Sequence, residues 1–275
     1  MLARRRVPAP VPPRREAGVR LPVALTVAGS DSGGGAGVLA DAATFRALGV
    51  WPTVAITAVT AQNTLGVHAA QVVAPTLVAA QIAAVREDMR PDAAKTGMLG
   101  AAAVVEAVAA ALRGVPNVVV DPVLRSTSGT ALLEEAGLRA VVEELLPLAA
   151  VVTPNLAEAA ALTGLEVGDR PAMAAAGAAL RAMGAEAALV TGGHLPGRVV
   201  ADCLVTADGV RWYEGRRIDG TGTHGTGCVL SAAVAARLAH GDTLAEAVGT
   251  ARQFVRRAVR RGVALGAGPG AVRPG

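Results

Sequence analysis

The residues best suited to chemistry lie in one glycine-rich stretch, 220–228, which leads into an Ala/Val/Leu segment. A loop of this kind exposes backbone N–H groups at the start of a helix, where the helix dipole also favours an anion. Cys228 falls at or just before the first helical turn, so we expect its pKa to lie below that of a free thiol. The stretch predicts an anion-binding loop with a candidate base. The alternative is a glycine-rich turn beside a buried, inert cysteine.

A second glycine-rich loop, 29–37, follows a short apolar strand at 23–28 and precedes a helix that runs to about residue 48. This order opens a βαβ unit, but no Gly-Lys-Ser/Thr follows, so the loop is not a Walker A motif. Asp41 shares one helix face with Val38 and Phe45. A carboxylate among apolar neighbours needs a partner. We favour an Asp41 that faces a ligand over a satisfied structural aspartate.

Polar residues also follow two predicted strands. A strand over 53–60 delivers Gln62, whose amide both donates and accepts and could read the edge of a heterocycle. The alternative for Gln62 is a turn before Gly66. Asp121 follows a strand at 117–120, and a carboxylate at such a strand end is a usual Mg²⁺-water ligand.

Other candidates are more ambiguous. Asn155 and Glu158 have the spacing of a capping box, and we favour the cap over a function for Glu158 near phosphates. Lys95 is the only lysine in the chain, which by itself proves nothing. Met98 suits either a core or an adaptable pocket wall.

The helices and strands predicted for the rest of the chain must position these residues. Helices alternate with short apolar strands, and Asp208-Gly209 marks the turn of a hairpin; the helices are expected over 75–87, 101–112, 134–146, 171–183, 229–238 and 243–261. This alternation predicts one α/β domain over 21–264, a three-layer sandwich with a mostly parallel central sheet flanked by helices. Residues 1–20 are predicted to be a disordered Arg/Pro-rich extension, and 265–275 a flexible Gly/Pro tail.

Composition excludes several classes of protein. The net charge of +4 arises in the first 20 residues, which hold six arginines and one glutamate, so the remainder carries 20 basic and 21 acidic side chains. That balance, with two Phe, two Trp and one Tyr in the whole chain, disfavours a nucleic-acid-binding module. The sequence shows no membrane span and no convincing secretory signal. Cys203 and Cys228 have neither metal-site spacing nor a disulfide framework, which fits a reducing cytoplasm.

Five ordered motifs together resemble a known family. They comprise residues 28–41, 57–64, Lys95-Thr96-Gly97-Met98-Leu99, 153–159 and His224-Gly225-Thr226-Gly227-Cys228. Their order and spacing closely resemble the hydroxymethylpyrimidine/phosphomethylpyrimidine kinases of thiamine biosynthesis, over about residues 21–266. The resemblance implies the ribokinase-like fold, a cytoplasmic homodimer, and ATP-dependent, Mg²⁺-assisted phosphorylation of 4-amino-5-hydroxymethyl-2-methylpyrimidine and then of its monophosphate, giving the pyrophosphate.

The resemblance also assigns roles to residues. It implies a pyrimidine site at Gln62, Gly29, Asp41, Thr60 and Met98, a catalytic loop at Gly225, Thr226, Gly227 and Cys228, a nucleotide site at Asn155, Thr191, Gly192 and Thr223, and a Mg²⁺–phosphate site at Asp121 and Glu158. Cys228 matches the position at which sugar kinases of the superfamily place an aspartate base. Phosphoryl transfer relies mainly on positioning and charge neutralisation, so a thiol at this position is chemically acceptable.

Two departures from the family pattern leave alternatives open. Thr191 stands where the family usually has a lysine before Gly-Gly-His, and residues 124–129 are a variant of the usual segment. One alternative is a pyridoxal or pyridoxine kinase, which shares the fold and the reaction but takes a different ring. Another is a regulator that binds pyrimidine without catalysis. Thr191 is the only support for the regulator, and the intact loop at 225–228 argues against it.

Overall fold

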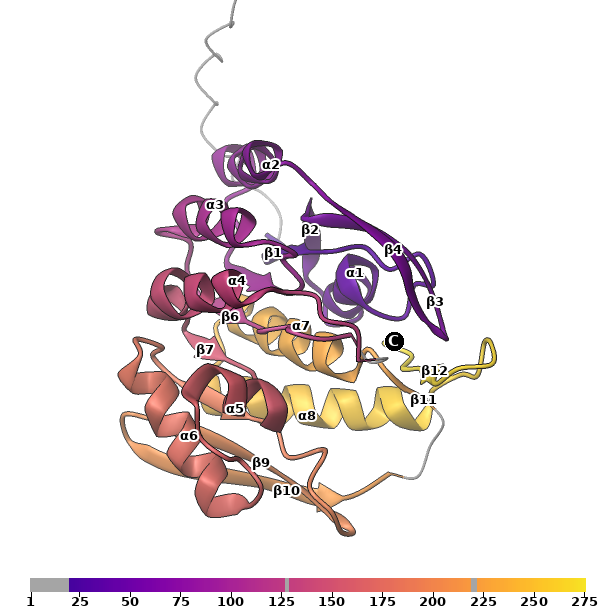
Figure 1. Cartoon of the computed structure of the whole chain (residues 1–275), viewed down its shortest axis with the longest axis vertical. Helices are drawn as coiled ribbons and strands as arrows, with labels where there is room; N and C mark the ends of the chain where they lie inside the picture. Colours follow the sequence, from indigo (N-terminus) through magenta and orange to yellow (C-terminus); the bar gives the residue numbers. More distant parts are fainter. Residues whose placement is uncertain (1–19, 127–128, 219–221) are drawn as a thin grey trace, which may run out of the picture.

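The computed structural model describes residues 20–126, 129–218 and 222–275, and one eight-stranded sheet runs through it (Figure 1). The strand order is β10-β9-β8-β7-β6-β5-β1-β2. Neighbouring strands from β2 to β8 are parallel, and β9 is antiparallel to both of its neighbours, β8 and β10. The predicted mostly parallel sheet is therefore confirmed. The strands are β1 (Val23–Ala28), β2 (Trp51–Ile56), β5 (Ala93–Thr96), β6 (Val118–Val120), β7 (Val151–Val152), β8 (Ala188–Val190), β9 (Val199–Thr206) and β10 (Gly209–Arg216).

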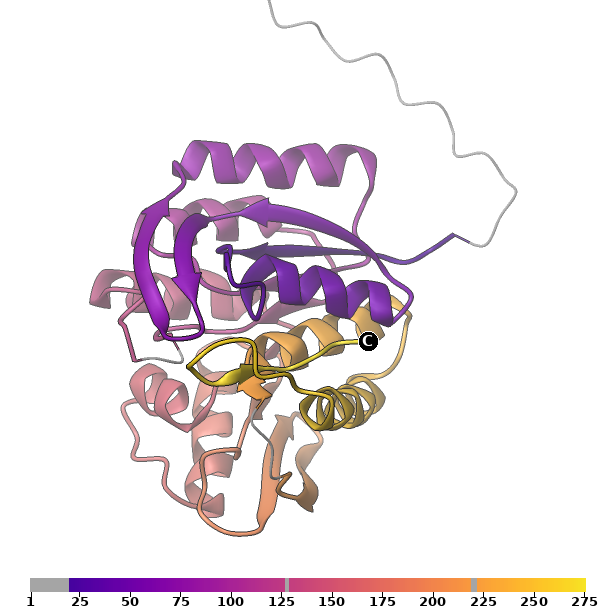
Figure 2. The same cartoon turned by 90° about the vertical axis from the view of Figure 1, so that its right-hand side faces the viewer.

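Helices cover both faces of this sheet (Figure 2). One face carries α2 (Pro75–Asp88), α3 (Ala102–Leu112), α4 (Glu135–Ala140), α5 (Leu156–Thr163) and α6 (Arg170–Ala182), with a π-helical turn η1 (Val141–Leu145) and a 3₁₀ turn η2 (Leu146–Leu148) after α4. The other face carries α1 (Gly37–Ala47), α7 (Thr226–Ala239) and α8 (Leu244–Arg260). The three-layer prediction is therefore confirmed.

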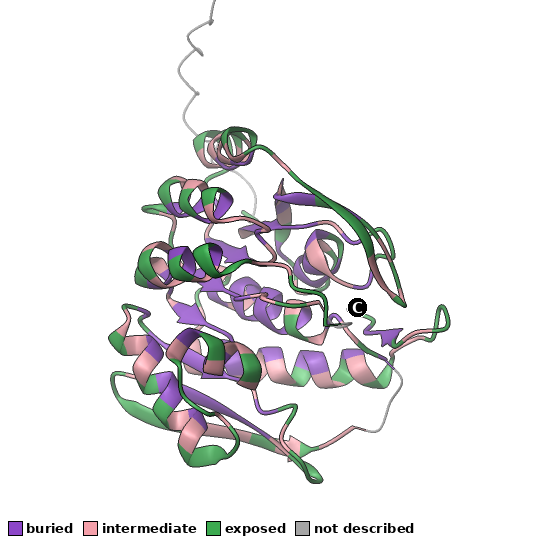
Figure 3. Ribbon diagram, in the orientation of Figure 1, coloured by how far each residue is buried: buried purple, intermediate pink, exposed green. Residues whose placement is uncertain are grey.

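The two cores share the strands between them. Successive residues of a strand face opposite sides, so Val118 and Val120 enter the core under α3 while Val119 enters the core under α7. A parallel strand buried on both faces has no polar side, which explains the unbroken Val/Ala runs in the sequence. Figure 3 shows this buried interior, and α7 is the helix most deeply enclosed by it.

The strand predicted over 53–60 is wrong, because the chain leaves the central sheet at Thr57. There the Thr57 N–H donates to the Ala28 carbonyl, and its hydroxyl donates to the Met98 carbonyl at 2.6 Å. A new strand, β3 (Ala58–Asn63), then pairs antiparallel with β4 (Gly66–Val72). Gln62 therefore lies on this separate hairpin and not at the end of a sheet strand.

The C-terminal segment was predicted to be a flexible tail, and this is wrong for 270–272. The short strand β12 (Gly270–Ala271) pairs with β11 (Gly222–His224), and both Ala271 and Val272 are buried. Val272 joins the core beneath α1, α7 and α8, which supplies the apolar contact that holds the segment. At the other end, residues 1–19 of the predicted extension lie outside the described residues, while Arg20 pairs with Asp92 at 2.9 Å. No helix in the described part of the chain is both long and apolar enough to cross a membrane.

Candidate active site

The two glycine-rich loops of the sequence meet through the side chain of Asp31. Its carboxylate accepts hydrogen bonds from the backbone N–H groups of Gly33, Gly35 and Ala36, at 2.8 to 3.1 Å. It also lies 3.1 Å from the His224 ring nitrogen Nε2. Burial alone would raise the pKa of Asp31, but these hydrogen bonds and His224 hold it below its ordinary value. Asp31 therefore ties the first loop to β11.

The glycine at the start of α7 is required by this contact between loops. Gly225 is the N-cap residue of α7, with a left-handed φ of 84°, and a Cβ there would collide with the Gly35 carbonyl oxygen. The helix begins at Thr226, three residues earlier than predicted, so Cys228 lies within its first turn. The N–H groups of this turn have no partner inside the helix. The predicted arrangement, a glycine loop that runs into a helix N-terminus, is confirmed.

A fully buried ion pair lies in the core beside α7. The Lys95 ammonium is 2.9 and 2.8 Å from the two oxygens of Asp41, and 3.8 Å from Asp121. Thr26 donates to Asp41 at 2.6 Å, and Ser231 of α7 donates to Asp121 at 2.8 Å. Burial alone would lower the pKa of Lys95, but the surrounding negative charge, led by Asp41, raises it above its ordinary value. The lysine therefore stays charged.

This pair changes the interpretation of Asp41. The side chain has no exposed surface, and its need for a partner is met by Lys95 and Thr26. The structure thus shows Asp41 as a satisfied buried carboxylate, the alternative interpretation, while a contact between Asp41 and a ligand stays a prediction. Sequence reasoning missed the partner, although a single lysine inside a buried Ala-Ala-Lys-Thr strand was a signal, because a buried ammonium needs a carboxylate nearby.

Cys228 lies at the centre of these groups. Its thiol interacts with the backbone N–H of Gly37 and with the charges of Lys95, Asp41 and Asp121. Burial raises the pKa of Cys228 to about 12; Lys95 acts to lower it, while the two carboxylates raise it further. The prediction of a lowered pKa is therefore wrong, because burial and two nearby negative charges outweigh one lysine and the helix N-terminus. At neutral pH the thiol keeps its proton.

Four of the candidate ring-binding residues gather around the first glycine loop. The Gly29 N–H donates to the Met98 carbonyl at 3.1 Å, and a Cβ at Gly29 would lie 3.1 Å from the Met98 sulfur. On β3, burial alternates so that Thr60 and Gln62 share the inner face. The hydroxyl of Thr60 donates to the Ser30 carbonyl at 2.8 Å, which fastens the hairpin to the loop. The hairpin thus covers the side of the loop that Met98 borders.

The candidate nucleotide residues come from two neighbouring strand ends. Asn155 and Thr191 form an isolated parallel bridge, and the Gly192 N–H donates to Asp202 at 2.8 Å. Thr223 lies on β11 and is exposed, and its carbonyl accepts from the hydroxyl of Thr226 at 2.6 Å. The structure thus brings Asn155, Thr191 and Gly192 together and places Thr223 at the start of α7.

The predicted capping box at α5 is confirmed. Asn155 Oδ1 accepts from the Glu158 N–H at 3.0 Å, and Glu158 accepts from the Asn155 N–H at 2.9 Å. Burial and the charge of Asp121 together raise the pKa of Glu158 to about 8. The charge of Asp121 therefore acts on Glu158, and a cation bound near both carboxyl groups would relieve this repulsion.

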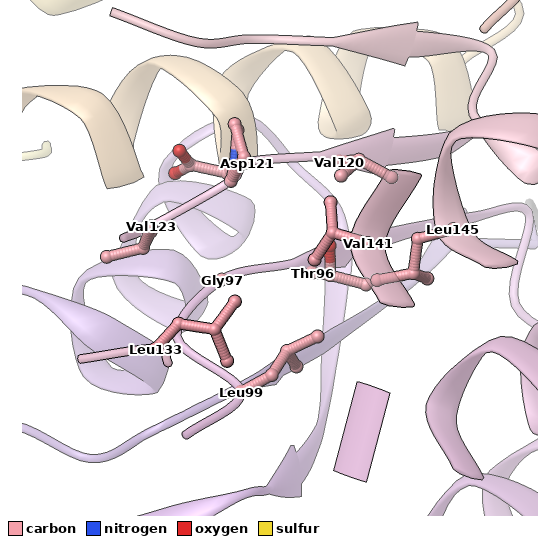
Figure 4. A pocket seen from close by; sticks show the side chains of 10 residues that line it. Thr96, Gly97, Leu99, Val120, Asp121, Val123, Leu133, Val141 and Leu145 are labelled. Carbon is pink, nitrogen blue, oxygen red and sulfur yellow. The ribbon is translucent and has the colours of Figure 1, made fainter. Parts of the chain in front are cut away.

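A small cavity lies behind the site, on the α3–α4 side of the sheet (Figure 4). Thr96, Val120, Leu133, Val141 and Leu145 line it, and its volume is about 10 Å³. A volume of this size accepts at most about one water molecule. The buried hydroxyl of Thr96 has no hydrogen-bond partner in the structure. Asp121 also borders this cavity, which is too small for a heterocycle.

The match to a family model decides the assignment: residues 31–273 match the phosphomethylpyrimidine kinase model. The chain belongs to the phosphomethylpyrimidine kinase family. The hydroxymethylpyrimidine/phosphomethylpyrimidine kinase of Rhizobium meliloti is 48% identical over 250 residues, which cover 90% of this chain and 94% of that protein. The thiamine biosynthesis bifunctional protein ThiED of Geobacter sulfurreducens is 42% identical over 90% of this chain and 51% of its own length.

Solved structures place the phosphomethylpyrimidine kinase fold in a wider group. An ADP complex of Bacillus subtilis pyridoxal kinase superposes with a TM-score of 0.86 at 34% identity, covering 93% of this chain and 98% of that one. The predicted ribokinase-like fold and the resemblance to this family are therefore confirmed. The individual residue roles that the resemblance implied stay predictions.

Proposed function

We propose that this chain uses ATP to phosphorylate 4-amino-5-hydroxymethyl-2-methylpyrimidine and then its monophosphate, as a step of thiamine biosynthesis. The observation that carries the proposal is the meeting of two glycine-rich loops around Cys228, with Met98 and the hairpin on one side and the start of α7 on the other. The names of relatives that match nearly the whole chain support the same reaction.

The proposed roles follow from this arrangement. Gln62 would hydrogen-bond to the ring, and Gly29, Thr60 and Met98 would line its pocket. The substrate oxygen attacks the terminal phosphorus of ATP, a new P–O bond forms, and the bond to ADP breaks. The N–H groups of Gly225–Cys228 would stabilise the charge on the transferring phosphoryl group. The hydroxyl proton leaves late, to water or to an oxygen of the transferred phosphoryl group, which places little demand on a base.

Cys228 needs a more careful assignment, because a protonated thiol cannot accept a proton. A base role therefore requires that substrate binding first removes the thiol proton. We expect Cys228→Ala to lower kcat about 100-fold, the usual contribution of a general base, with the KM for the pyrimidine changed less than about twofold. Equal losses in kcat and in pyrimidine binding would instead make Cys228 a structural residue.

The remaining proposed roles concern ATP and Mg²⁺. Asn155, Thr191, Gly192 and Thr223 would contact the nucleotide. The donor set fits Mg²⁺, since Asp121 and Glu158 offer only oxygen atoms and the charge of Asp121 already acts on the Glu158 carboxyl group. Among the described residues no group of three or more metal-binding side chains occurs, so phosphate and water oxygens would complete the coordination. The cation, when bound, neutralises charge on the phosphates.

A measurement of ADP release tests the proposal. Purified protein receives ATP and Mg²⁺ with hydroxymethylpyrimidine, its monophosphate or pyridoxal in separate reactions. Turnover of both pyrimidines with little turnover of pyridoxal is expected, and it would show that Thr191 is a tolerated variant of the usual lysine. Silence on all three substrates with retained pyrimidine binding would instead indicate a regulator on a kinase fold.

A second candidate, pyridoxal phosphorylation, is favoured by one observation: a pyridoxal kinase is among the solved structures that superpose well, with a TM-score of 0.86. Turnover of pyridoxal alone would establish it. Gln62 and Met98 favour the pyrimidine.

We also propose that the enzyme is a cytoplasmic homodimer, as the resemblance implies. Sedimentation of the purified chain tests the dimer, and a mass of one chain would overturn it.

A further inference from the structure

A second cavity lies on the helical face of the molecule, between the end of α1, the last turns of α8 and the C-terminal segment. Its volume is about 240 Å³. Its lining comprises the apolar residues Ala47, Leu48, Phe254 and Ala258, the arginines Arg257, Arg261 and Arg273, and the C-terminal Gly275. The cavity includes none of the residues assigned to the candidate active site, so an inference from it is independent of the proposed function.

The three arginines form no ion pair within the described part of the chain, although the terminal carboxylate of Gly275 also lines the cavity. None of the ion pairs and side-chain hydrogen bonds formed there uses them, although other arginines of the same region, such as Arg252 and Arg237, are paired with aspartates. Aspartate and glutamate are also missing from the lining of this cavity. Arg257 and Arg261 lie one helical turn apart, a spacing at which like charges repel.

A simpler explanation is that arginines near the end of α8 interact with the helix dipole. The dipole explains Arg260 equally well, yet Arg260 does not line the cavity. It does not explain Arg273, which comes from a different segment, held against α8 by a backbone hydrogen bond to the Ala258 carbonyl at 3.3 Å. Two elements therefore bring cations to one concave surface.

We propose that this cavity is a binding site for a small phosphate-bearing anion. One guanidinium group can donate two parallel hydrogen bonds to two oxygens of a phosphate group. Three guanidinium groups therefore suit a ligand with two or more negative charges. The cavity is smaller than the roughly 300–1,000 Å³ of sites for drug-sized ligands, so it takes a phosphate or diphosphate group with at most a small organic part. The apolar residues would contact that organic part.

Isothermal titration calorimetry of the full chain with inorganic pyrophosphate, and separately with inorganic phosphate, tests the proposal. The Arg257→Ala/Arg261→Ala variant is compared with wild type and with Arg260→Ala, a matched control that removes an exposed charge from the same helix but not from the cavity. Losing charge-assisted hydrogen bonds should weaken one binding event by about tenfold or more in the double variant and leave it unchanged in the control. The tighter of the two probes identifies diphosphate or monophosphate chemistry.

Two controls keep the result interpretable. The double variant should retain wild-type turnover and melting temperature, because its arginines lie outside the active site. If it fails to fold, Arg273→Gln, which alters a single side chain of the C-terminal segment, takes its place with the same expected loss. Equal binding by wild type and the arginine variants, or equal weakening by Arg260→Ala, would overturn the proposal.

Discussion

Two buried aspartates near the site have different structural roles. Asp41 holds Lys95 in the core, whereas Asp31 collects backbone N–H groups from one loop and the ring of His224 from another. In the sequence, Asp31 lies within the glycine-rich loop and Asp41 on the helix that follows, but only their neighbours from distant segments distinguish the two roles. A carboxylate that joins two loops should be needed for their geometry, and its removal can be detected by the pH dependence of stability.

Asp31→Asn should destabilise the protein in a pH-dependent way. The folded-state pKa of Asp31 lies below its unfolded value of about 3.9, so its stabilising effect is present above pH ~4 and is lost as the pH falls through the folded-state pKa. We expect a loss of about 2 kcal/mol in the free energy of unfolding at pH 7 that shrinks toward pH 3. Urea denaturation at both pH values measures it, with the exposed Asp88→Asn as control. An equal loss at both pH values would contradict the assignment.

The two thiols should react slowly in the native protein. Burial raises the pKa of Cys203 to about 11 and that of Cys228 to about 12, so little thiolate is present at pH 8. We expect iodoacetamide at pH 8 to modify both cysteines far more slowly in the folded chain than in guanidinium chloride. Mass spectrometry of the alkylated protein follows each site. Rapid, selective labelling of Cys228 in the folded chain would instead support the lowered thiol pKa that its position at a helix N-terminus predicts.

The elements around the site differ in how well the sequence predicted them. The parallel strands and most helices follow from local hydrophobic pattern and turn residues, and the capping boxes at Asn155 and Thr243 fix two helix starts within a few residues. The break between β2 and β3 was missed, because Thr57 lies in a run rich in β-branched residues, which favours one continuous strand. Only its hydrogen bonds to Ala28 and Met98, which are distant in sequence, direct the chain out of the sheet.

Two threonines on neighbouring strands allow a matched test of buried hydroxyls. Thr96 of β5 has a buried hydroxyl without a partner, beside a cavity with mainly apolar lining, whereas Thr26 of β1 donates to Asp41. Because an unpaired buried hydroxyl is unfavourable, Thr96→Val should stabilise the protein by about 1 kcal/mol, and Thr26→Val should destabilise it by about 2 kcal/mol. Denaturant unfolding of both variants measures these two changes in the free energy of unfolding. Destabilisation by Thr96→Val would show that a bound water satisfies this hydroxyl.

At the scale of the whole molecule, the site depends on segments from both ends of the chain. The order of the motifs predicted the family, because glycine-rich loops and the residues at strand ends form short contiguous patterns that can be recognised in the sequence. The packing of the C-terminal segment against the core could not be predicted from such short patterns. A run rich in glycine and proline at 264–275 is typical of a frayed terminus, and only the tertiary partners of Val272 in the core show otherwise.

This contact predicts that the last residues matter for stability and for activity. Val272 packs in the core, and its N–H donates to the carbonyl of His224 at 3.1 Å, next to the ring that contacts Asp31. Deleting residues 270–275 removes β12 and one buried valine, which should cost about 2 kcal/mol or more. Because β11 loses its partner strand, kcat should fall further than the stability loss alone explains at 25 °C.

Thermal unfolding and the ADP-release assay measure the two effects of this deletion. A variant that lacks residues 1–19, which belong to the extension predicted to be disordered, is the control for shortening the chain and should match the full chain in both assays. The substitution Val272→Ala separates the contributions, since it removes apolar contact but keeps the backbone N–H that bonds to His224. We expect it to lower the melting temperature while kcat stays near wild type. A C-terminal deletion as stable and active as the full chain would mean that the segment only covers the core surface.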